Sequence, residues 1–69
     1  MINYEITVYI NDDECTEVVL PVTYEKEYDL RRDITNMGIS GVLQKDEDNN
    51  FLYYPSHRIN KIVVEKVWP

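Results

Sequence analysis

Strict alternation of apolar and mostly polar side chains at the start of the chain constrains its fold more than any other feature. In "INYEITVYI", which runs from Ile2 to Ile10, every even position holds isoleucine, tyrosine or valine. Successive side chains of a β-strand point to opposite faces of a sheet, so a period of two predicts a strand with one buried face. The chain therefore has to cover one side of a sheet.

A second strand is predicted at residues 16–22, after the segment "NDDE". Asn and Asp side chains bond to neighbouring backbone groups and tolerate left-handed conformations, so this segment is typical of a turn. Pro21 has no amide donor, which predicts that the second strand lies at a sheet edge or breaks there. Together the two strands predict a hairpin.

One helix is predicted within "YEKEYDLRRDITNMG". Leu30, Ile34 and Met37 recur at the spacing of one helix face. Asp29 is the predicted N-cap, and Gly38 is the predicted left-handed C-cap. A helix of about eight residues does not persist alone in water, so it has to lie on the sheet.

The remaining sequence predicts three more strands. "GVLQK" and "FLYY" flank the polar turn "DEDNN" as a second hairpin, and "INKIVVEKV" is the last strand. Apolar side chains on both faces of the last strand predict either a central position, or one face against the helix and the other against a partner. Residues 24–28 fit either an extended helix or a longer second strand.

These elements predict a single α+β domain, residues 1–69, with the order β-β-α-β-β-β. Its four or five short strands would form a small twisted antiparallel sheet or a partial barrel, with the short helix across it. The predicted core consists of Ile6, Val8, Ile10, Val18, Leu20, Leu30, Ile34, Met37, Val42, Leu43, Phe51, Ile62 and Val64.

The net charge of −6 is concentrated in the first part of the chain, where residues 1–29 hold eight acidic residues and one lysine. Repulsion from phosphates argues against direct nucleic-acid binding as the main task. It leaves open a basic protein partner, and the plain alternative is a surface that keeps a small domain soluble. The predicted acidic face consists of Asp12, Asp13, Glu14, Glu17, Glu25 and Glu27.

The sequence offers no grouping typical of catalysis or of metal and cofactor binding. Cys15 is the only cysteine, so neither an internal disulfide nor a cysteine cluster for zinc is expected. The segment "DEDNNF" begins like a calcium loop, but such a loop requires glycine where Phe51 stands and glutamate at its twelfth position, where His57 stands. We therefore expect no enzyme activity, no metal and no cofactor. The lone cysteine, and a start without a signal peptide or a membrane span, predict a cytoplasmic protein without membrane attachment.

The segment "FLYYPSHR" is the best candidate for a binding patch. Pro55 fixes its own φ and holds Tyr54 extended, which suits a corner between strands and needs no ligand. On the functional interpretation, tyrosines and cations form an exposed patch of the kind favoured at interface hot spots. The predicted interaction patch consists of Tyr53, Tyr54, His57, Arg58 and Trp68.

The stretch "YPSHRINKIVV" resembles the "YKHAISTI" stretch of the bacterial Sm-like RNA chaperones. His57, Ile59 and Ile62 occur at matching spacing. Ser56 stands where that family has lysine, and Pro55 stands where it has tyrosine. The resemblance is confined to this stretch, and it implies a shared strand–corner–strand arrangement rather than kinship.

Two hypotheses of function follow. The first is a small acidic protein-interaction module that inhibits or mimics a ligand of a nucleic-acid-binding or defence-type enzyme, as phage-encoded and accessory inhibitors do. The second is a homo-oligomer that binds a small ligand or nucleotide at a subunit interface near Tyr53, Tyr54, His57 and Arg58.

The C-terminal strand also predicts association between copies. Val63, Val67 and Trp68 add apolar surface that one short helix cannot cover, which predicts a homo-oligomer with the strand Ile59–Trp68 at or near the contact. The alternative is that Trp68 folds back over the core of its own chain.

Overall fold

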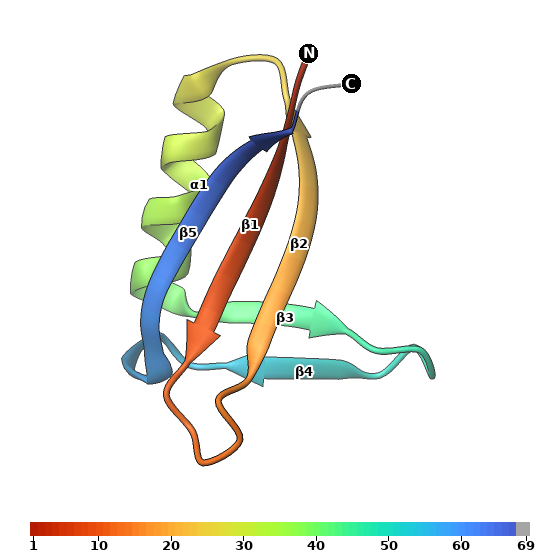
Figure 1. Ribbon diagram of the computed structural model, residues 1–69, viewed down its shortest axis with the longest axis vertical. Coiled ribbons are helices and arrows are strands. Elements are labelled where there is room, and N and C mark those ends of the chain that lie inside the picture. The colour runs from red at the N-terminus through yellow and green to blue at the C-terminus, as the bar shows by residue number, and fades with distance from the viewer. Residues whose placement is uncertain (68–69) are drawn as a thin grey trace.

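The computed structural model describes residues 1–67, in which five strands form two antiparallel sheets and one α-helix covers the larger sheet (Figure 1). The elements are β1 (Ile2–Ile10), β2 (Glu17–Tyr24), α1 (Glu27–Ser40), β3 (Val42–Lys45), β4 (Phe51–Tyr54), the 3-10 turn η1 (Ser56–Arg58) and β5 (Ile59–Val67). The predicted α+β class and the order β-β-α-β-β-β are confirmed. The strands divide into a three-stranded sheet, β2-β1-β5, and the two-stranded sheet β3-β4.

The strand with the clearest alternation, β1, is the centre of the three-stranded sheet. It pairs with β2 on one side and with β5 on the other. Pro21 lies opposite Glu5 on the edge strand β2, which confirms the predicted edge. A central position for the last strand is wrong, because β5 forms the other edge.

The helix is longer than predicted and begins and ends at other residues. It spans the 14 residues Glu27–Ser40, with Lys26 at the N-cap, so Asp29 is not the cap but lies in the first turn. There its carboxylate still favours the helix through the dipole. Gly38 lies inside the helix, and Gly41 takes the positive φ of 90° at the C-cap, where its N–H bonds to the Met37 carbonyl oxygen at 3.0 Å.

Both expectations for residues 24–28 are partly right. Tyr24 ends β2, residues 25 and 26 form a bend, and Glu27 and Tyr28 already belong to α1. Within residues 1–67, no helix has the length and apolar character required to cross a membrane.

The core lies between α1 and the even-numbered face of β1. Ile6, Val8 and Val18 are completely buried. Ile10, Leu30 and Val42 are also buried, so six predicted core residues are confirmed. Leu20, Ile34, Met37 and Ile62 are only partly buried and pack around this cluster.

Three predicted core residues are wrong. Leu43 and Phe51 are 58% and 64% exposed, because β3 and β4 form their own sheet, which projects away from the core (Figure 1). Val64 is 37% exposed, because its strand β5 is an edge of the larger sheet.

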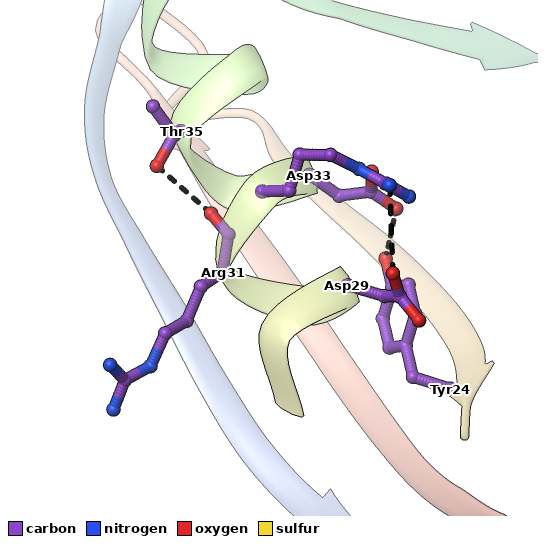
Figure 2. A network of polar contacts seen from close by, with 6 residues as sticks. Tyr24, Asp29, Arg31, Asp33 and Thr35 are labelled. Atoms are coloured by element: carbon purple, nitrogen blue, oxygen red, sulfur yellow. Dashed lines mark hydrogen bonds and ion pairs between the residues drawn. The ribbon is translucent and has the colours of Figure 1, made fainter. Parts of the chain in front are cut away.

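A hydrogen bond ties the end of β2 to the helix. Figure 2 shows Tyr24 reaching towards α1, where its hydroxyl donates to Asp33 Oδ2 at 2.7 Å. The ring of Tyr24 also packs against Tyr4, with 6.3 Å between ring centroids. Burial, and then the bond to the Asp33 carboxylate, raise the pKa of Tyr24 to about 12.

This bond predicts a loss of stability in alkaline solution. The folded pKa of about 12 lies above the ordinary value of 10.0, so the contribution of Tyr24 is complete below pH 10.0 and is lost as the pH rises through 12. In urea unfolding, the stability difference between the parent and Tyr24→Phe should therefore shrink over this range. A difference that stays constant with pH would contradict this assignment.

Candidate functional site

The structure divides the predicted interaction patch between the two faces of β4. Tyr53 lies opposite Leu43, is 60% exposed, and donates its hydroxyl proton to the Ser40 carbonyl oxygen at 2.7 Å. Tyr54 lies opposite the buried Val42 and packs partly against the core. The two tyrosines therefore belong to different surfaces.

Tyr54 does meet His57 and Arg58 at the end of the three-stranded sheet. These three line an open hollow of about 370 Å³, which is completed by Ile10, Asp12 and Pro55. Trp68 lies outside the described residues.

The backbone around this hollow forms the predicted corner. Pro55 has a φ of −66°, and its carbonyl oxygen accepts the Arg58 N–H at 3.0 Å, which closes η1. The Arg58 carbonyl oxygen accepts the Asn11 N–H at 2.6 Å, and the Arg58 guanidinium donates to the Asn11 carbonyl oxygen at 3.4 Å. The corner is thus fastened to the β1–β2 turn.

The predicted acidic residues form two separate groups rather than one face. Asp12, Asp13 and Glu14 lie in the β1–β2 turn next to Glu17, at one end of β2 (Figure 1). The second group consists of Glu25 and Glu27, which lie at the other end of β2, where the chain enters α1.

Asp12 holds the β1–β2 turn together. Its Oδ2 accepts the Thr16 hydroxyl at 2.6 Å, and its Oδ1 accepts the Thr16 N–H at 2.9 Å. These bonds, the hydroxyl one first, lower the pKa of the Asp12 carboxyl from its ordinary value of 3.8. Cys15, in the same turn, is exposed and has a positive φ of 54°.

Replacing Thr16 by valine should raise the pKa of Asp12 towards 3.8, because the largest cause of the lowering disappears while the backbone bond remains. The Asp12 carboxyl carbon shift, followed by NMR during acid titration, measures this. A carboxyl whose pKa is lower in the folded than in the unfolded chain stabilises the fold at pH values above its unfolded pKa, and this stabilisation is lost as the pH falls through the folded pKa. The parent should therefore lose more stability in acid than Thr16→Val. An unchanged Asp12 titration in the variant would contradict the arrangement.

The β3–β4 hairpin carries an exposed apolar surface, which includes two residues predicted for the core, Leu43 and Phe51, and one predicted for the interaction patch, Tyr53. On one face, Leu43 lies opposite Tyr53, and Phe51 lies opposite Lys45. We call Leu43, Phe51 and Tyr53 the hairpin face; they are 58%, 64% and 60% exposed. Leu52, on the other side of the ribbon, is 44% exposed.

Three acidic residues, Asp46, Glu47 and Asp48, occupy the tip of this hairpin. The Oδ1 of Asp46 accepts the N–H groups of Asp48 and Asn50, both at 2.9 Å, and Asn49 has a φ of 65°. These bonds confirm the predicted turn. Asp46 therefore shapes the tip, while Glu47 and Asp48 are exposed in the loop that joins Lys45 to Phe51.

Within residues 1–67, no three His, Cys, Asp or Glu side chains gather closely enough to hold a metal ion. Protein-family models, curated proteins and solved structures were compared with the chain, and none of the three comparisons finds a match.

Proposed function

We propose that this chain is a small acidic protein-interaction module that binds its partner through the β3–β4 hairpin. The observation that carries the proposal is the hairpin face, where three large side chains on neighbouring strands are each more than half exposed. An exposed aromatic and aliphatic cluster on a projecting element is typical of a binding surface.

The energetics of a two-stranded ribbon support this. An isolated hairpin is marginally stable in water, because neither face has enough apolar cover. Here the base is fixed by buried Val42 and by the bond from Tyr53 to Ser40, while Phe51 near the tip is exposed. Contact with a partner would bury Leu43 and Phe51 and stabilise the ribbon at the same time.

The charge of the tip favours a partner with basic residues around an apolar groove. Glu47 and Asp48 are exposed in the loop that joins Lys45 to Phe51, and the whole chain carries −6. Such charges steer association and set specificity more than they add affinity. A cytoplasmic nucleic-acid-binding or defence-type enzyme, inhibited when its basic surface is blocked, is the class of partner that we propose.

The test compares capture by the parent with capture by the double variant Leu43→Ser, Phe51→Ser, in lysate of the source organism. A matched control is Ile39→Ser, because Ile39 is 70% exposed on α1, outside the hairpin. One protein should be retained by the parent and the control and lost by the double variant. Equal retention by all three chains, each shown to be folded by circular dichroism, would overturn the proposal.

With that protein purified, the salt dependence tests the charge argument. Affinity should fall as ionic strength rises, because exposed charges are screened beyond about 8 Å at physiological salt. Reversing the two tip charges, with Glu47→Lys and Asp48→Lys, should slow association and flatten the salt dependence. A salt-independent affinity would exclude the acidic mode of recognition, but would leave the apolar contact in place.

A second candidate function is supported by the hollow beside η1. It brings Tyr54, His57 and Arg58 together, which is three of the four residues expected to bind a small ligand or nucleotide between subunits. Arg58 would pair with a phosphate group, and Tyr54 would offer an aromatic surface. NMR titration with ATP tests this: shifts confined to the hollow would support it, and no shift at millimolar ATP would remove it.

A further inference from the structure

The outer edge of β5 has unpaired backbone groups, as the hydrogen bonds around β1 show. The Ile10 N–H bonds to Thr16 on the β2 side at 2.9 Å, while the Asn11 N–H bonds to Arg58 on the β5 side at 2.6 Å. Along a strand these directions alternate, so odd residues of β1 bond to β5. Their register partners Lys61, Val63 and Glu65 thus bond inward, and Ile62 and Val64 direct their N–H and C=O groups outward.

The two edges of the sheet differ in protection. By the same alternation, Pro21 directs its nitrogen outward from β2, where it has no proton to donate to an added strand. Within the described part of β5, no proline interrupts the edge. Natural sheets block edges that must stay unpaired with prolines or bulges, and β5 has a register irregularity only at its start, between Ile59 and Lys61. The stretch from Lys61 to Glu65 beyond it is therefore available for pairing.

On the helix side of the sheet, side chains of the edge strand β5 are less completely buried than those of the central strand β1. On the helix side of the sheet, Ile6 is completely buried, whereas its register partner Val64 is 37% exposed. Apolar surface therefore continues to the edge of β5. The β3–β4 hairpin projects past β2, at the side of the sheet opposite to β5 (Figure 1).

We propose that β5 pairs with β5 of a second copy of this chain, antiparallel, about a two-fold axis at Val63. This register places the outward groups of Ile62 opposite those of Val64 in the other copy. The backbone directions match, because both residues point outward. The contact joins two three-stranded sheets into one continuous sheet and covers both Val64 side chains.

Charge complementarity selects this register and this occupant. With the axis at Val63, Lys61 of each copy lies opposite Glu65 of the other, on the face away from the helix. A slip of two residues either way removes both pairs, and a slip of four places identical charges opposite one another. Opposite charges across a strand pair are stabilising, and like charges are destabilising.

Within one chain, Glu65 faces a like charge. It lies opposite Glu5 on β1. Lys61, whose ammonium lies 4.8 Å from the Tyr9 ring centroid of its own chain, would in a second copy supply a cation beside this carboxylate pair. Dimerisation is independent of the hairpin function, but it would present two hairpins to a partner and raise avidity.

Sedimentation equilibrium of the full chain tests the proposal through charge swaps. Lys61→Glu alone and Glu65→Lys alone each place like charges opposite one another, and should raise the dimer dissociation constant roughly ten- to a hundredfold. An equimolar mixture of the two variants should associate again, because every pair across the contact is then one lysine and one glutamate. The double variant Lys61→Glu, Glu65→Lys should dimerise like the parent.

Two further variants control for charge and for folding. Lys45→Glu on β3 changes the net charge as Lys61→Glu does, but away from β5, and should leave dimerisation unchanged. Val64→Pro removes an outward amide without breaking the ladder to β1, and should give a folded monomer. A parent that stays monomeric at millimolar concentration, a Lys61→Glu variant that dimerises normally, or a mixture that fails to associate would each overturn the proposal.

Discussion

Ile6→Ala is expected to lower the free energy of unfolding by about 3 kcal/mol, since deletion of a fully buried isoleucine side chain typically costs ~2–5 kcal/mol. Ile6 lies on the central strand β1 with no exposed surface, between Leu20 on β2 and Val64 on β5. Strands pair on both sides of it, so the backbone cannot collapse into the cavity. A domain of this size has a total stability of roughly 3–10 kcal/mol, and this one change removes a large part of it.

Urea unfolding followed by circular dichroism measures this effect. Ile39→Ala is the matched control, because it removes the same atoms from a side chain that is 70% exposed on α1. The control should change stability by less than about 0.5 kcal/mol, as surface substitutions usually do. Equal losses in the two variants would show that Ile6 is not the centre of the core.

The strand β1 was predictable to the residue, and the reason is physical. Its alternation is long enough that a shift of one residue would expose Ile6, Val8 and Ile10 together. Pro21 was an equally clear signal for an edge, since it cannot donate to a ladder. The alternation of β1 and the missing amide proton of Pro21 are both local properties of one segment, so neither requires knowledge of how the rest of the chain packs.

The helix boundaries were predicted less well, because several residues were acceptable at each position. Asp29 and Gly38 are reasonable caps, but Lys26 and Gly41 hold the cap positions. An interior glycine costs about 1 kcal/mol, which the packing of Leu30 against the sheet offsets. Tertiary contacts thus decided the length of this element.

The exposure of the hairpin face required knowledge of how the strands divide into sheets. The β3–β4 ribbon has apolar side chains on both faces, with Val42 on one and Leu43 on the other. Only one face can reach the core, and the sequence does not say which. Consecutive residues of a strand point to opposite faces, so the separation of Tyr53 from Tyr54 was predictable from the sequence.

The acidic residues were grouped by their closeness in sequence. Glu17 and Glu25 belong to one acidic segment, yet β2 carries them to opposite ends of the sheet. An extended strand rises about 3.3 Å per residue, so a run of like charges that includes a strand separates into distinct clusters. The local charge of the hairpin tip therefore says more about a binding partner than the net charge of the whole chain does.

The hairpin is positioned by one glycine at the end of the helix. Gly41 has a φ of 90° and a ψ of −172°, a conformation essentially restricted to glycine. A Cβ at this position would collide with the Tyr54 carbonyl oxygen, and would lie 3.0 Å from the Tyr53 hydroxyl oxygen and 3.1 Å from the Pro55 Cα. Two of these three obstacles are backbone atoms, which cannot turn aside as a side-chain end can.

Gly41→Ala is therefore expected to lower the free energy of unfolding by about 3 kcal/mol, combining backbone strain of ~1–3 kcal/mol with the cost of displacing β4. It should also weaken the bond from Tyr53 to Ser40, so NMR shifts should change most in the hairpin. Gly38→Ala is the matched control, because no atom lies within 4 Å of its added Cβ. Inside a helix, alanine is favoured over glycine by up to ~1 kcal/mol, so the control should be more stable than the parent. The two substitutions add the same methyl group three residues apart, and urea unfolding should show opposite signs; a shared sign would mean that Gly41 does not set the hairpin's position.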